Sequence, residues 1–269
     1  MWPLFIENCR YILRSRMILL VLLFSTLVHY SGLKLVSHLT LYIQNSVTVL
    51  GPAEMLTVSL YLQLFTALSI AAVYGIWMAP YAHKGERSLL THVLPVEKIK
   101  FPICYSFCCG LILMINELVL LAVFWSIKGA QTFSFSELPW NNLINAFAFQ
   151  TLCLEVLMLF LALGSLVLGH VATVFLGASS LFIMQILGAM SSLVKNSPET
   201  PFFSLKGLFV FLFEKLPPVG NFLFDFHRVV KGENILGSHL ILWCSWLVVA
   251  HLLFWVKIRY PSKNRSTEA

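Results

Sequence analysis

Long apolar runs, separated by short polar stretches, make up most of this chain. Six of the runs are long enough to cross a membrane as helices, since a crossing takes about 20 mainly apolar residues. They cover residues 17–33, 55–79, 101–127, 143–168, 171–194 and 238–256. The pattern predicts an all-α, polytopic membrane protein with about six transmembrane helices, formed by a single domain over residues 1–269.

The segments between the runs predict the remaining elements. Residues 1–16 place three arginines among apolar side chains, which is typical of an amphipathic N-terminal helix lying in the headgroup region. We expect an external connection over 37–53, where a Gly-Pro pair marks a break, and a tight turn over 164–170.

Residues 195–237 form the longest connection, which we expect to be external. This segment is itself semi-apolar but too charged for a clear crossing, so we expect interfacial or re-entrant helices before the last span. Its end predicts a rigid outer turn rather than a site. The residues that carry this interpretation are Pro217, Pro218, Asn221, Phe224 and Asp225.

The segment over residues 80–100, PYAHKGERSLLTHVLPVEKIK, is the most charged stretch between apolar runs in the first half. Its leucines and valine recur at helical spacing, at Leu89, Leu90, Val93 and Leu94, and Pro95 ends that pattern. The spacing predicts a short amphipathic helix on a membrane surface, by which another protein could bind the bundle. An ordinary solvated loop is the alternative.

Composition and charge support a membrane protein and set its orientation. Hydrophobic residues make up 58% of the chain and charged residues 11%, whereas a soluble domain is about 25% charged. The net charge of +6 needs no nucleic-acid partner, because Lys and Arg hold cytoplasmic loops on the inner face. Their distribution favours both termini on the cytoplasmic side of the cell inner membrane, with 80–100 cytoplasmic as well.

Neither the apolar runs nor the loops carry a motif of catalysis or metal binding. The chain contains no G-x-x-x-x-G-K-[ST] loop for ATP, and no H-E-x-x-H, G-x-S-x-G or C-x-x-C. Its eight histidines are scattered, and its six cysteines lie mostly in apolar runs. We therefore predict no catalytic residue, no metal site and no cofactor of its own.

Two acidic residues, Glu117 and Glu155, interrupt apolar runs. An ionisable side chain inside a span is costly and tends to face a cavity or a partner, so a proton or cation path is one interpretation. The other, which we prefer, is that each is protonated or hydrogen-bonded within the bundle, for example to Asn116, Gln150 or Gln185.

The order of these elements resembles a known family. The charged segment between the second and third runs contains KGER, then Ser88, then Leu89 and Leu90, and then Pro95 and Val96. A second pattern, LPPVGNFLFDF over residues 216–226, is similar to the proline-asparagine segment that precedes the last crossing in that family. Nearly the whole chain thus resembles the type 2 permeases of ATP-binding-cassette (ABC) exporters. The copper-enzyme maturation and gliding-associated permeases belong to the group it resembles.

The resemblance implies a transmembrane permease subunit, not an enzyme, that exports a substrate with ATP bound and hydrolysed by a separate subunit. Its partners would be a cytoplasmic ABC ATPase, a second permease chain, identical or related, and membrane lipid. Residues 80–100 would be the coupling loop that meets the ATPase. The coupling residues implied are Lys84, Gly85, Glu86, Arg87, Leu89, Leu90 and Pro95.

Other functions stay open at this point. A membrane scaffold without transport would share the spans but need no coupling loop. An intramembrane enzyme would use Glu117, Glu155 or a histidine. A secondary transporter usually shows internal repeats, and the two halves of this chain show no convincing similarity.

Overall fold

The computed structural model describes residues 5–6, 9–10, 15–43, 52–78, 100–127, 139–195, 221–235 and 237–259. Within these ranges the regular elements are all helical, which confirms the predicted all-α class. They are α2 (Arg16–Ile43), α3 (Pro52–Val73), the π-helix η1 (Tyr74–Met78), α6 (Lys100–Ser126), α7 (Trp140–Leu168), α8 (His170–Lys195), α10 (Phe222–Val230) and α11 (Gly237–Arg259).

Five helices of the described chain are long and apolar enough to cross a membrane, which confirms a polytopic membrane protein. They cover Arg16–Val36, Met55–Trp77, Pro102–Ser126, Trp140–Leu168 and Gly237–Ile258. The fifth predicted run coincides with α8, a helix of 26 residues whose side chains are described only as far as Ile183.

Several predicted boundaries are wrong, each for a local reason. The connection expected over 37–53 is shorter, because α2 continues to Ile43 through a stretch without Gly or Pro, and α3 begins at Pro52, a favoured first helical residue. The turn expected over 164–170 shrinks to Gly169, since α7 runs to Leu168. Gly169 has φ of 88°, a conformation that glycine adopts without steric cost.

The rigid outer turn expected around Asn221 and Asp225 is also wrong, because helix α10 begins at Phe222. Its buried residues, at 222, 225, 226 and 229, follow helical spacing, so the signal for a helix was present in the sequence. Pro217 and Pro218 lie outside the described residues.

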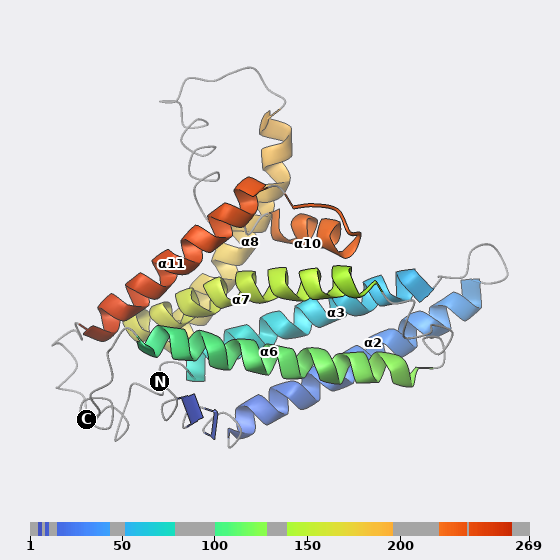
Figure 1. Ribbon diagram of the computed structural model, residues 1–269, viewed down its shortest axis with the longest axis horizontal. Helices are drawn as coiled ribbons and strands as arrows, with labels where there is room; N and C mark the ends of the chain where they lie inside the picture. The colour runs from blue at the N-terminus through green and yellow to red at the C-terminus, as the bar shows by residue number, and fades with distance from the viewer. Residues whose placement is uncertain are drawn as a thin grey trace.

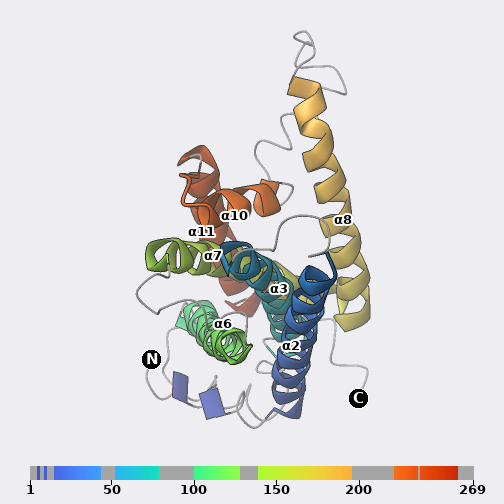
Figure 2. The same cartoon turned by 90° about the vertical axis from the view of Figure 1, so that its right-hand side faces the viewer.

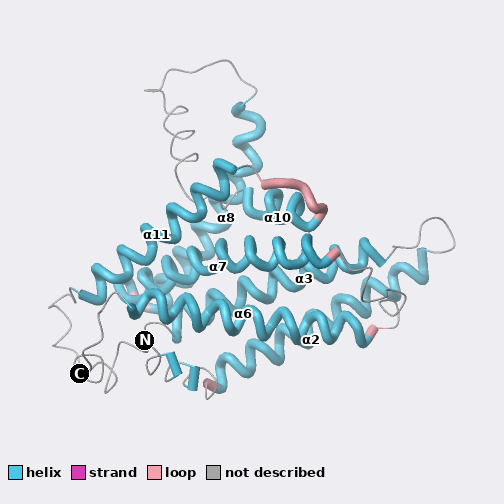
Figure 3. The backbone as a smooth tube through the Cα atoms, in the orientation of Figure 1, coloured by secondary structure: helices cyan, strands magenta, loops and turns pink. Residues whose placement is uncertain are grey.

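The long helices α2, α3, α6, α7 and α11 pack side by side in an elongated bundle (Figures 1 and 3), while α8 leaves the end of α7 and diverges from it (Figure 2). One end, which we call the η1 end, holds η1, the start of α6, the α7–α8 corner and the end of α11 (Figure 1). At the other, the α10 end, α10 packs against α7 near the start of that helix.

Two buried clusters fill the bundle, one toward each end. The cluster at the η1 end includes Tyr74, Cys108, Met158 and Phe254. The cluster at the α10 end is more aromatic, with Phe149, Phe222, Phe226 and Trp243. Because lipid tails are as apolar as these side chains, close packing rather than transfer from water holds such helices together.

Candidate functional site

The predicted coupling residues, Lys84, Gly85, Glu86, Arg87, Leu89, Leu90 and Pro95, lie outside the described residues, as does most of the N-terminal helix predicted over 1–16. Apart from Lys100, the coupling loop predicted over 80–100 falls in residues 79–99, the 79–99 segment, and the structure describes the elements on either side of this segment. These are η1, which ends at Met78, and α6, which begins at Lys100. Both of these elements lie at the η1 end of the bundle.

The π-helix η1 packs against the backbone of α7 through Gly75. A Cβ atom at position 75 would lie 2.6 Å from the carbonyl oxygen of Met158 and 3.2 Å from Cβ of Leu161. Real Cβ atoms essentially never approach so closely, so only glycine allows this contact. Turns with π-helical bonding are frequent at functional sites.

Ser165 of α7 joins η1 to the first residue of α8. Its hydroxyl donates to the carbonyl oxygen of Ile76 at 2.8 Å and lies 2.6 Å from Nδ1 of His170. The Ser165 hydroxyl has one proton, which it donates to the Ile76 carbonyl. In the hydrogen bond with His170, Ser165 must therefore be the acceptor, and Nδ1–H of His170 the donor. Ser165 is buried, and its hydroxyl satisfies the Ile76 carbonyl in the only turn of η1.

The corner between α7 and α8 is held by small residues. The Thr173 hydroxyl donates to the Gly169 carbonyl at 2.7 Å, and a Cβ at Gly164 would lie 3.1 Å from Cγ2 of Thr173. Farther along, a Cβ at Gly177 would meet Leu161 at 2.8 Å. Close helix approach through small residues is a common packing mode in membranes, and here it sets the direction in which α8 departs.

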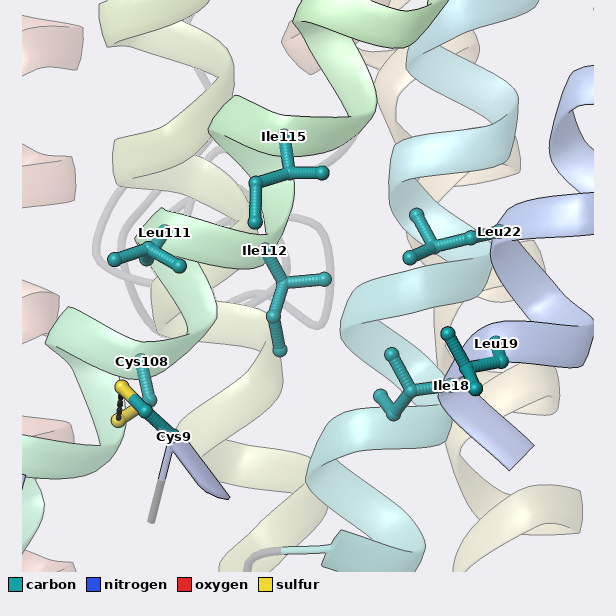
Figure 4. Close-up of a pocket in the computed structure, with 8 residues that line it drawn as sticks. All are labelled: Cys9, Ile18, Leu19, Leu22, Cys108, Leu111, Ile112 and Ile115. Atoms are coloured by element: carbon teal, nitrogen blue, oxygen red, sulfur yellow. Dashed lines mark hydrogen bonds between the residues drawn. The ribbon is translucent and has the colours of Figure 1, made fainter. Parts of the chain in front are cut away.

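Residue 9, within the predicted N-terminal helix, also reaches this region. The Cys9 sulfur lies 3.9 Å from the Cys108 sulfur of α6, beside a cavity of about 50 Å³ between α2 and α6 (Figure 4). Cys9 and Phe5 pack against the buried cluster that contains Tyr74 of η1. The beginning of the chain and η1 therefore contact one buried cluster.

The two intramembrane glutamates do not lie together. Glu117 of α6 accepts a hydrogen bond from Gln150 of α7 at 3.0 Å, as the preferred interpretation anticipated for that residue. Glu155 of α7 instead lies beside Gly110 of α6, where a Cβ would be 3.3 Å from its Oε1. Residues 110 and 117 are about 10 Å apart along a helix axis, so the two carboxyl groups occupy different levels of the bundle.

Polar contacts between α2, α3 and α6 were missed at the sequence level. Ser25 donates to Asn116 at 2.9 Å, and the Ser59 hydroxyl lies 3.0 Å from Nε2 of His29. Ser25 and His29 are four residues apart on α2, and Ser59 and Gln63 are four residues apart on α3, so each pair lies on one helix face. This spacing was the sequence signal from which the contacts could have been predicted. On these three helices, three buried side-chain nitrogens find no partner among the described residues: His29 Nδ1, Gln63 Nε2 and Asn116 Nδ2.

A second missed group fixes α10 to the bundle. Nδ1 of His239, on α11, lies 2.8 Å from a carboxylate oxygen of Asp225, which is fully buried. The Tyr61 hydroxyl of α3 lies 2.5 Å from Nδ1 of His227. Tyr61 and His227 are 166 positions apart, and Asp225 and His239 are 14 positions apart on two different helices, so spacing alone could not pair them.

The described residues contain no group of three or more His, Cys, Asp or Glu side chains arranged to hold a metal ion. Comparison with known proteins adds no identification, because no protein-family model matches the chain and no match was found among curated proteins. This geometry provides a tightly packed corner at the end of the bundle where Met78 and Lys100 flank the charged segment, together with polar groups between the helices.

Proposed function

We propose that the chain is the transmembrane permease subunit of an ABC exporter, which moves a substrate across the cell membrane with ATP bound and hydrolysed by a separate subunit. One observation supports this proposal above the others. Both elements that flank the charged 79–99 segment are at the end of the bundle where η1 is locked to the α7–α8 corner.

In this proposal the 79–99 segment receives the movement of the ATPase and η1 passes it on. Gly75 and Ser165 join η1 to α7 by a backbone contact and a hydrogen bond, and His170 extends the link to α8. A shift of η1 would therefore carry α7 and α8 with it. Nucleotide binding favours one arrangement of the bundle by the difference in its coupling to the two arrangements.

The remaining parts of the proposal concern assembly. Two such chains, identical or related, would pair with two ATPase subunits, with the 79–99 segment and both termini on the cytoplasmic side of the inner membrane. Lys84, Gly85, Glu86 and Arg87 would form the charged part of the contact. Leu89 and Leu90 would insert in a groove of the ATPase.

The test is co-purification of the tagged chain from detergent-solubilised membranes, with and without the double substitution Leu89→Asp and Leu90→Asp. We expect a P-loop ATPase to co-purify with the unaltered chain. In the double variant its recovery should fall at least about tenfold, because two charges placed in an apolar contact cost well over 1.4 kcal/mol.

A matched control adds the same charge to the opposite face of the predicted helix through Ser88→Asp and Thr91→Asp, and it should retain the ATPase. Recovery of the chain without any ATPase would contradict the permease proposal and favour a scaffold or an intramembrane enzyme. Equal loss in both double variants would show that added charge, and not the leucine face, is responsible.

A further inference from the structure

A cavity of about 200 Å³ lies between α6 and α7, toward the α10 end. Its rim is apolar and includes Met114, Leu118 and Ile144, which are exposed on the outside of the bundle. A helix surface exposed at this depth faces lipid. The cavity therefore opens sideways, into the apolar part of the membrane.

Three polar side chains, Gln63, Glu117 and Gln150, line the cavity among apolar ones. Gln63 of α3 and Gln150 of α7 are each 2% exposed, and Glu117 of α6 lies beside them. Gln150 donates through Nε2 to Oε1 of Glu117 at 3.0 Å, whereas Nε2 of Gln63 finds no partner in the described chain. A buried amide donor without an acceptor is costly, and here it lines a cavity with room for one.

The charge of Glu117 also lacks a partner. No Lys, Arg or His of the described residues forms an ion pair with it, and its second carboxylate oxygen, Oε2, makes no hydrogen bond there. A carboxyl group inside an apolar span is stable only when a proton or a positive charge neutralises it. The wall thus offers one acceptor for a cationic donor and, at Gln63, one donor for an oxygen.

We infer that this cavity binds a membrane amphiphile with a primary ammonium group, an adjacent oxygen and a long apolar chain. The ammonium group donates to Oε2 of Glu117, and the adjacent hydroxyl or carbonyl oxygen accepts from Nε2 of Gln63. The apolar chain leaves between Met114, Leu118 and Ile144 into the membrane. The site uses the chain's own residues, so the inference is independent of the proposed ATPase partner.

The alternative is that Glu117 carries a proton, bonds only to Gln150, and borders a groove that any lipid tail can fill. The two arrangements differ in head-group selectivity. If Glu117 and Gln63 bind the head group, an amphiphile with an amine beside its hydroxyl binds more tightly than a neutral alcohol of the same length. If the cavity only holds lipid tails, the two bind equally.

The test uses the purified full-length chain in lipid nanodiscs and a long-chain vicinal amino alcohol that carries a diazirine in its tail. After illumination, labelled peptides are located by mass spectrometry, and the matched diazirine alcohol without an amine is the comparison probe. We expect saturable labelling of the segments around Met114, Leu118 and Ile144 by the amino alcohol, at least about tenfold above that by the alcohol.

Variants separate the site from general effects on the fold. Glu117→Gln should lower labelling about tenfold and Gln63→Leu should lower it several-fold, while Glu117→Asp, which keeps the charge, retains part of it. The matched control is Glu155→Gln, which removes an equal charge at another level of the same helix pair and leaves labelling unchanged. Equal labelling by the two probes, or unchanged labelling in a Glu117→Gln chain of normal thermal stability, would overturn the inference.

Discussion

The two ends of the bundle are held together in opposite ways. At the η1 end the contacts depend on small residues and backbone atoms: Gly75 against the Met158 carbonyl, and Ser165 donating to the Ile76 carbonyl. At the α10 end they depend on large or charged side chains, such as the Asp225–His239 pair and the aromatic ring of Trp243.

The difference shows how each end tolerates change. A contact between backbones leaves no space, so at the η1 end added atoms are damaging. A contact between long side chains leaves a hole or an unpaired group when one of them is shortened, so at the α10 end removed atoms are damaging. The η1 end is therefore suited to transmit a shift, because tightly packed elements move together.

The largest effect should come from adding atoms to η1 at Gly75. Gly75→Val places a Cβ 2.6 Å from the Met158 carbonyl oxygen and adds two further carbons, so η1 must move away from α7. We expect a loss of about 3 kcal/mol or more in the free energy of unfolding, at the upper end of overpacking costs. The measurement is the thermal unfolding midpoint of the purified chain in detergent.

Gly237→Val is the matched control, because no atom of the described residues, apart from its chain neighbours and its own helix backbone, lies within 4 Å of the Cβ it would add at the start of α11. It should change stability by less than about 0.5 kcal/mol. Equal midpoints for the two variants would contradict the backbone contact between η1 and α7.

The second effect is the removal of a side chain at the α10 end. His239→Ala leaves the fully buried Asp225, whose Oδ1 already has no partner in the described chain, without its remaining hydrogen bond. We expect a loss of about 2–3 kcal/mol, since an unsatisfied buried charge costs more than a neutral group. The same detergent unfolding assay measures it.

His251→Ala on the same helix sharpens this result. His251 lies 2.9 Å from the Ser106 hydroxyl, a neutral partner, so its removal should cost only about 1 kcal/mol. Equal losses for the two histidine variants would mean that the charge of Asp225 does not contribute to holding α10 in place.

Much of the fold was predictable because apolar length is a local property. The limits of α6 and α11 agree with their predicted runs within a few residues, and Glu117 bonds to Gln150, one of three partners named from the sequence. The cavity beside Glu117 was not predictable, because its walls come from α3, α6 and α7 and depend on how these helices pack.

The contacts at the two ends were harder to predict for the same reason. In the π-helical turn at Tyr74–Met78, the Ile76 carbonyl accepts a hydrogen bond from Ser165, 89 residues later, and nothing in the local sequence identifies that partner. Asp225 precedes His239 by 14 residues, across a turn between α10 and α11. In contrast, α10 itself could have been predicted, because its apolar residues follow helical spacing.

The smallest effect on stability is the most informative about function, and it compares one hydroxyl from each end. Ser165→Ala removes the bond to the Ile76 carbonyl, and Tyr61→Phe removes the bond to His227 while keeping the ring against Phe226. Each should cost about 1 kcal/mol.

Under the proposed function, however, only Ser165→Ala loosens the link between the 79–99 segment and α7, so only this variant should lower substrate-stimulated ATPase activity of the assembled complex. Since both variants keep the 79–99 segment, both should retain the ATPase in a pull-down. If both lowered the activity equally, general destabilisation would explain the loss, and the η1 end would have no special part in coupling.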